Sequence, residues 1–195
     1  HQKGDHSLDD RSDQTLRNVP VSPACTANRH PLPGENMVRI TVASPGIYTY
    51  GAMLIGGILR DAGYAVTITR EIQNVPGEVL FLSLYSTQHL LNPAIKTEIA
   101  AFKSRGGRCI IGGPVSSDPE MVFGELDPDI VVSGEGEEAV LSILASDAPD
   151  SWINCVYREG ENLRRTQTRR PADLSRPLPL IPDDINSQDI RGAQT

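Results

Sequence analysis

The chain has 195 residues, 38% of them hydrophobic, a formal net charge of -7 at pH 7 and a pI near 5.1. This length and composition suit one main hydrophobic core, and the acidic balance argues against a nucleic-acid-binding surface, which needs a clustered excess of Lys and Arg. The longest apolar stretch, AMLIGGIL, is too short to cross a bilayer, so we expect neither a nucleic acid nor a membrane as a partner.

The first organised element is expected after a polar leader. Residues 1–36 contain four prolines and show no hydrophobic period, which predicts disorder. Residues 37–43, MVRITVA, form a β-branched run typical of a buried strand. After the turn SPGIYTYG, apolar residues recur at helical spacing from Leu54 to Ala62, and Gly63 is placed as a carboxyl-terminal cap. The first unit is therefore a strand, a loop and a helix.

Units of the same kind follow along the chain. Further strands are predicted in the runs AVTIT, EVLFLSL, RCIIGG and DIVVSG. Further helices are predicted to begin at Asn92-Pro93 and Asp118-Pro119 and to run from Glu137 to Leu144. Parallel strands need crossover connections, which place helices on both faces of the sheet. Residues 37–148 are therefore expected to form a doubly wound, flavodoxin-like (Rossmann-like) α/β domain with a five-stranded parallel sheet.

The pattern changes after Pro149. The runs WINCVY and LRRTQT flank REGEN, which predicts a small β-hairpin appendage over residues 149–170. The run RRPADLSRPLPLIPDDI has four prolines, which favour an extended Pro-rich strap, so residues 171–195 are interpreted as an extended linker. Because the last residues carry no stop signal or cap, we expect a further domain beyond them.

A ligand site is expected beyond the carboxyl ends of the strands, where open parallel sheets bind ligands. Glycines there allow close approach of the backbone to a ligand, and tyrosines offer flat faces to a planar one. Taken alone, each is equally well explained by turn chemistry or by capping of the core. The candidate cofactor-binding residues are Tyr48, Tyr50, Gly51, Ser83, Tyr85, Gly112, Gly113, Pro114, Gly134, Glu135, Gly136 and Glu137.

Other kinds of site are disfavoured. Gly134-x-Gly136-x-x-Ala139 fits the dinucleotide fingerprint, but it follows the fifth strand and its glutamates would repel a pyrophosphate. A receiver domain would need an acidic pair after the first strand, where the sequence has Ala43-Ser44-Pro45. His89 has no nucleophile motif nearby. We therefore expect no catalytic residue in this chain.

The spacing of the cysteines indicates the redox state of the cellular compartment. Cys25, Cys109 and Cys155 lie far apart without a CxxC motif, which suits a reducing environment and excludes a metal site built from these cysteines alone. The amino-terminal residues lack the apolar core of a signal peptide. A cytoplasmic protein with no metal ligands of its own is expected.

Residues 37–195 resemble the cobalamin-binding domain that precedes the radical core in cobalamin-dependent radical S-adenosylmethionine (radical SAM) proteins. The strongest part is IIGGP followed by DPDIVVSGEGEEAVLSIL, which looks like the GGP and DxVVxGEGE signatures of that family. RRPADLSRPLPLIPDDI is similar to the strap that leads into the radical core. The combination is specific, although each piece alone is not.

The resemblance also suggests roles for individual residues. Older cobalamin domains use DxHxxG, SxL and GG motifs, in which the His replaces the cofactor's own base beneath cobalt. Here GIYTYG has Gly46 at the Asp place and Tyr48 at the His place, and it keeps Gly51. By resemblance, Ser83 and Gly112-Gly113 border the nucleotide tail of the cofactor, and the turn at Tyr48 faces the corrin ring.

The resemblance implies cobalamin as the cofactor of this segment. It further implies a radical SAM core in cis, beyond Thr195, in which a CxxxCxxC motif holds a [4Fe-4S] cluster and S-adenosylmethionine binds. The parent would be an enzyme, with methyl transfer as the candidate reaction, and this segment would supply no complete active site. The alternative is a degenerate domain that acts only as a docking scaffold for the radical core. An independent flavin- or nucleotide-binding protein is a third, less favoured hypothesis.

Overall fold

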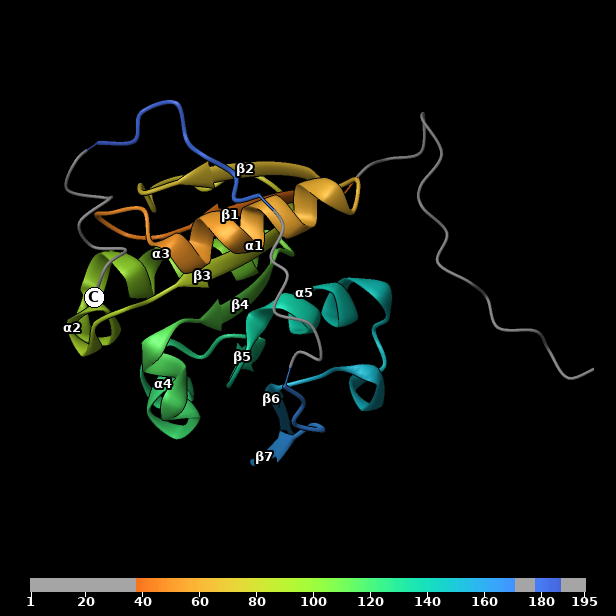
Figure 1. Cartoon of the computed structure of the whole chain (residues 1–195). Coiled ribbons are helices and arrows are strands. Elements are labelled where there is room, and N and C mark those ends of the chain that lie inside the picture. The colour runs from red at the N-terminus through yellow and green to blue at the C-terminus, as the bar shows by residue number, and fades with distance from the viewer. Residues whose placement is uncertain (1–37, 171–177, 187–195) are drawn as a thin grey trace, which may run out of the picture.

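The computed structural model describes residues 38–170 and 178–186 as one α/β unit (Figure 1). The predicted leader, residues 1–36, lies outside the described residues, as do residues 171–177 and 187–195 of the predicted linker. The seven strands, in the sheet order β2-β1-β3-β4-β5-β6-β7, are β1 (Arg39–Ala43), β2 (Ala65–Thr69), β3 (Val79–Ser83), β4 (Arg108–Gly112), β5 (Ile130–Val132), β6 (Cys155–Glu159) and β7 (Asn162–Arg165).

Helices connect the parallel strands except β2 and β3, which are joined by a loop over residues 70–78. Those described are α1 (Tyr50–Asp61), α2 (Thr87–Leu91), α3 (Pro93–Ser104), α4 (Pro119–Leu126) and α5 (Gly136–Ala145), with 3-10 turns at Pro114–Ser117 and Pro149–Ser151. Side-chain caps fix several starts: Thr49 accepts from the amide of Ala52, and Asn92 accepts from the amide of Ala94. The sequence anticipated α3 and α4 from their Asx-Pro pairs, but it did not predict the short helix α2.

Alternation along the strands divides the core into two layers. On one face, Val42, Phe81, Ile110 and Val132 pack with α1 and α5. On the other face, Leu80, Leu82, Cys109, Ile111 and Val131 pack with α3 and α4. Figure 1 shows α1 and α5 together on one side of the sheet. Both faces of the parallel strands are therefore covered, as the continuous apolar runs require.

The prediction of a five-stranded parallel sheet with a separate hairpin appendage is corrected. Strand β6 pairs antiparallel with β5, and β7 pairs antiparallel with β6, so the hairpin continues one mixed sheet of seven strands. The physical reason lies in β6, where Cys155 belongs to the α1 and α5 layer while Val156 belongs to the opposite layer. Both side chains are buried only if β6 covers the otherwise open edge of β5.

The described part of the strap, residues 178–186, contains no helix or strand and crosses α1. The amide of Leu180 donates to the carbonyl oxygen of Met53 over 2.8 Å, and Nη2 of Arg60 donates to the carbonyl oxygen of Leu178 over 3.1 Å. Gly57 permits this approach, because a Cβ there would overlap the carbonyl group of Leu178. Among the described residues, no helix is both long and apolar enough to pass through a bilayer.

Candidate functional site

A cavity of about 430 Å³ lies at the carboxyl ends of the central strands, between α1 and α5. The order of the parallel strands, β2-β1-β3-β4-β5, reverses direction between β1 and β3. Ligands of doubly wound sheets bind outside the carboxyl ends of the strands near such a reversal. The topology and the cavity therefore identify the same edge of the sheet as the candidate site.

The floor of the cavity is apolar and its rim is polar. Val42, Phe81, Ile110 and Val132 contribute the floor from four adjacent strands. Leu54 and Ile55 of α1 and Val140 of α5 form the apolar part of the walls. Tyr50, Ser83, Glu135 and Glu137 bring polar side chains to the lining. Such a site suits a ligand with an apolar part and a few groups that can form hydrogen bonds.

The structure brings together nine of the twelve candidate residues in the cavity lining. These are Tyr50, Gly51, Ser83, Gly112, Gly113, Gly134, Glu135, Gly136 and Glu137. The other three, Tyr48, Tyr85 and Pro114, do not line it. The members that line the cavity come from loops and strand ends far apart in the chain, and the parallel register of the sheet places them at one edge.

The prediction placed Tyr48 at the ligand side, but its side chain lies under residues 178–186. Tyr48 is 3% exposed, and its hydroxyl donates to Oδ1 of Asp184 over 2.8 Å. Nη2 of Arg70 donates to Oδ2 of the same carboxylate over 2.8 Å. Burial, followed by the contact with Asp184, raises the pKa of Tyr48 to about 12. The phenol is therefore neutral at pH 7 and held away from the cavity.

Tyr85 and Pro114 lie beside the cavity lining in sequence, but they have other surroundings. Tyr85 is 39% exposed, and its ring meets that of His89 edge to face at 4.5 Å between centroids. Burial lowers the pKa of His89. Pro114 begins a 3-10 turn after Gly113. Tyr85 and Pro114 therefore lie beside the cavity and do not line it.

The two glycines that follow β4 have different roles. Gly112 is the last residue of the strand and lies on the same face as Ile110, so a side chain there would project toward the cavity. Its Cβ would meet no closer neighbour than Cβ of Val132 at 3.9 Å. Gly113 has φ of +90°, and its Cβ would lie 2.6 Å from the carbonyl oxygen of Leu84. Gly113 is required by the backbone, whereas Gly112 leaves space for a ligand.

Sequence reasoning missed Thr49, which connects two parts of the site. Its hydroxyl lies 3.3 Å from the hydroxyl of Ser83 and 3.4 Å from that of the buried Ser44. The same oxygen caps α1. Its position one residue before the helix was a signal for an N-cap, but only the pairing of β1 with β3 brings it to Ser83.

Asn154 was also missed. It is 3% exposed, and its Nδ2 donates to the carbonyl oxygen of Glu135 over 2.9 Å. The available signal was an asparagine inside the apolar run WINCVY, since asparagine is depleted in strands and tolerates left-handed backbone.

The described residues offer no metal or cluster site. No group of three or more His, Cys, Asp or Glu side chains that could hold a metal ion occurs among them. Cys109 and Cys155 are both buried and belong to the two opposite layers of the core. An iron–sulfur cluster does not fit these two thiols.

No protein-family model matches the chain. The chain is similar to a protein of Methanocaldococcus jannaschii that carries the provisional name methylthiotransferase. The two are 41% identical over 162 residues, which cover 80% of this chain and 35% of that protein. The chain thus spans about a third of the length of this relative.

Proposed function

We propose that this chain binds cobalamin as a flavodoxin-like, amino-terminal domain of a radical SAM enzyme. The observation that carries the proposal is the apolar cavity at the carboxyl edge of the sheet, lined by Ser83, Gly112 and the loop from Gly134 to Glu137. The signatures that resemble those of cobalamin domains, GGP and DIVVSGEGE, supply the residues on two sides of that cavity.

The residues present fit the nucleotide tail of a cobalamin. Its benzimidazole base is flat and largely apolar, which matches the floor formed by Phe81, Ile110 and Val132. A side chain at Gly112 would fill this space, and a Cβ at Gly136 would lie 3.1 Å from Cδ1 of Ile55. The hydroxyl of Ser83, held by Thr49, can bond a polar group of the tail. The glycines therefore keep the cavity open at two points.

The polar rim favours a corrinoid over a dinucleotide. Glu135 and Glu137 lie at the amino terminus of α5, where their carboxylates can accept hydrogen bonds from amides. A corrin ring carries neutral amide side chains and the tail has a single phosphodiester charge, whereas a pyrophosphate would bring at least two negative charges beside these two acids. The chain's own residues would thus bind and orient the cofactor. Cobalamin, when bound, supplies a cobalt centre that can carry a methyl group.

The activity of the whole protein is part of the proposal. The relative named as a methylthiotransferase and the resemblance to radical SAM proteins both favour radical chemistry on S-adenosylmethionine. We assign the [4Fe-4S] cluster, S-adenosylmethionine and the transfer reaction to a radical core in cis, because Cys109 and Cys155 cannot hold a cluster. The described residues would contribute cofactor binding.

The test compares cobalamin with cobinamide, a corrinoid that lacks the nucleotide tail. The 195-residue chain is titrated with hydroxocobalamin, cobinamide and flavin mononucleotide, and binding is followed by absorption and equilibrium dialysis. We expect cobalamin to bind about tenfold or more tightly than cobinamide, because only cobalamin fills the cavity. Tight binding of the flavin, or equal affinity for both corrinoids, would contradict the proposal. Absence of all binding would favour the docking-scaffold hypothesis.

A further inference from the structure

Asn154 ties one wall of the cavity to the end of the hairpin. Its Nδ2 donates to the carbonyl oxygen of Glu135 over 2.9 Å and to that of Arg169 over 3.0 Å, and its Oδ1 accepts from the amide of Arg169 over 2.7 Å. Its own carbonyl oxygen accepts from the amide of Ser133 over 2.8 Å. Both ends of the buried side-chain amide are therefore satisfied.

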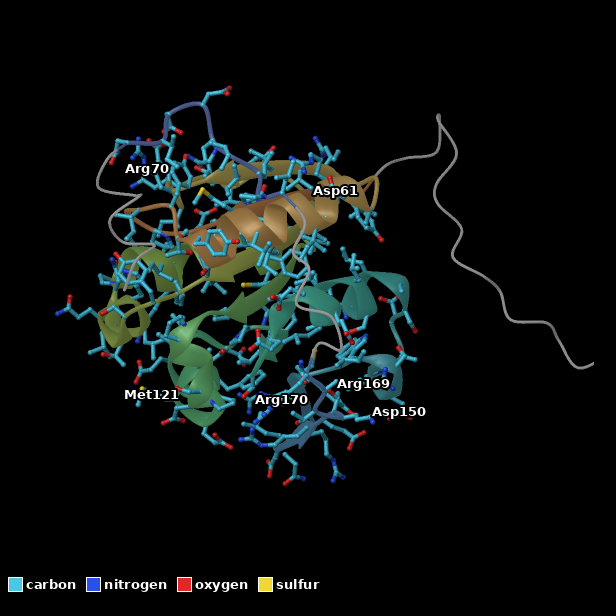
Figure 2. All side chains as sticks on the ribbon, viewed as in Figure 1. Asp61, Arg70, Met121, Asp150, Arg169 and Arg170 are labelled. Carbon is cyan, nitrogen blue, oxygen red and sulfur yellow. The ribbon has the colours of Figure 1, made fainter. Side chains whose placement is uncertain are left out.

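The backbone at this position explains why the residue is an asparagine. Asn154 has φ of 56°, a left-handed conformation that asparagine adopts more readily than most residues. Facing it, Gly134 has φ of +137°, and a Cβ there would lie 3.4 Å from Cγ of Asn154. The loop and Asn154 are thus packed directly against each other. Arg169, which Asn154 also holds, is labelled in Figure 2 close to the hairpin strands.

The bonded loop is the one that lines the cavity. Gly134, Glu135 and Gly136 all belong to the lining, whereas Asn154 does not. Glu135 is also the N-cap of α5, yet its side chain forms no capping hydrogen bond. The bond from Asn154 to the Glu135 carbonyl is therefore one of the contacts that fix the direction in which this loop enters the helix.

We propose that Asn154 is a positioning residue for the ligand site: it holds the Gly134–Gly136 wall in the conformation that receives the nucleotide tail. This inference rests on the proposed function, because it assigns the tail of a corrinoid to the cavity. It predicts that a change at Asn154 weakens binding of the tail and leaves binding of the corrin ring unchanged.

Two variants distinguish the effect of losing the side-chain amide from the effect of changing the backbone conformation. Asn154→Gly removes the amide while tolerating φ of 56°. Asn154→Asp keeps the shape and the acceptor but, when ionised, cannot donate to the carbonyl oxygens of Glu135 and Arg169. The matched control is Asn74→Gly, because Asn74 has a similar φ of 52° and lies in the turn between β2 and β3, outside the cavity lining.

The experiment measures the dissociation constants of hydroxocobalamin and cobinamide for the full chain and the three variants. For Asn154→Gly and Asn154→Asp we expect the constant for cobalamin to rise about tenfold, while that for cobinamide stays within about twofold. Asn74→Gly should change neither constant. Hydrogen exchange in the ligand-free protein should be faster at the amide of Ser133, which donates to the carbonyl oxygen of Asn154, in the Asn154 variants alone, because this loop has lost its support.

Unchanged cobalamin affinity in a folded Asn154→Gly protein would overturn the inference. Equal weakening of cobalamin and cobinamide, together with a lower thermal midpoint, would also overturn it, because a general loss of structure affects both ligands. If the unmodified chain binds neither corrinoid, the proposed function fails. The role of Asn154 in positioning the loop is then judged by hydrogen exchange, and unaltered exchange at the amide of Ser133 counts against it.

Discussion

The hydroxyl of Tyr48 donates a 2.8 Å hydrogen bond to Oδ1 of Asp184, 136 positions later in the chain. The guanidinium carbon of Arg70, labelled in Figure 2, lies 5.3 Å from the centroid of the Tyr48 ring, and its Nη2 also reaches the Asp184 carboxylate. By the resemblance to cobalamin domains, Tyr48 stands where the older ones have a histidine. In this protein the hydroxyl of Tyr48 holds the described part of the strap, residues 178–186, against the edge of the sheet.

Tyr48→Phe is expected to lower the midpoint of thermal unfolding by about 2 °C, since one hydrogen bond is lost while the ring stays buried. The matched control is Tyr50→Phe. Tyr50 is 44% exposed, so this substitution should give no measurable shift of the midpoint. Equal midpoints for unmodified protein and Tyr48→Phe would show that the bond to Asp184 does not contribute.

The same substitution has a pH signature. The pKa of Tyr48 is raised in the folded protein to about 12, above its ordinary value of 10.0, so the stabilisation from its neutral form is complete below about pH 10 and is lost as the pH rises through about 12. Urea unfolding should therefore show a steeper loss of stability over this range for the unmodified protein than for Tyr48→Phe. Parallel curves would contradict the assignment.

Tyr48 is not expected to coordinate cobalt. Its phenol is neutral at pH 7, donates a hydrogen bond to Asp184 and lies outside the cavity lining. Neutral phenol is a poor metal ligand compared with imidazole. With bound cobalt(II) cobalamin, electron paramagnetic resonance should give the same spectrum for the unmodified protein and for Tyr48→Phe. A change in the axial hyperfine pattern on this substitution would show that the tyrosine is a ligand after all.

Gly57→Ala should release the strap from α1, because the new Cβ would overlap the backbone carbonyl group of Leu178. The amide of Leu180, which donates to the carbonyl oxygen of Met53, should then exchange with solvent at least about tenfold faster. Gly124→Ala is the matched control, since Gly124 lies in α4 with no heavy atom within 4 Å of the added Cβ. Unaltered exchange at Leu180 would mean that the strap adjusts to the extra methyl group.

Adjacent glycines should respond differently to substitution. Gly113→Ala is expected to destabilise the fold by about 1–3 kcal/mol, because φ of +90° and the contact with Leu84 exclude a side chain. Gly112→Val should leave the unfolding transition nearly unchanged and weaken binding of hydroxocobalamin, because its side chain would project into the cavity. Denaturation and titration of both variants check this, and normal binding by Gly112→Val would place the ligand elsewhere.

The two buried thiols should be unreactive in the folded protein. Cys109 and Cys155 are 0% and 1% exposed. Burial raises the pKa of both thiols above the ordinary value, that of Cys155 to about 12, so little thiolate forms at pH 8. In a Cys25→Ser variant, labelling by a disulfide reagent should be at least about 100-fold slower than in guanidinium chloride. Rapid labelling would reveal an opening of the core.

The sequence determined much of the architecture by itself. Continuous β-branched and apolar runs predict buried strands, and the Asx-Pro pairs before Ala94 and Glu120 predict helix starts, because both are local preferences of the chain. Because the carboxyl ends of parallel strands share one edge of the sheet, the same pattern was sufficient to predict that Ser83, Gly112 and Glu135 lie at one site.

Only the tertiary structure decided which candidates face the cavity. Tyr48 and Tyr50 are two positions apart in one turn, yet Tyr50 lines the cavity while Tyr48 lies under Asp184. The bonds of Asn154 to Glu135, and the pairing of β6 with β5, likewise depend on segments that are distant in sequence. Hydrophobic period and turn chemistry report on neighbouring residues, whereas burial and hydrogen-bond satisfaction depend on what the folded chain brings into contact.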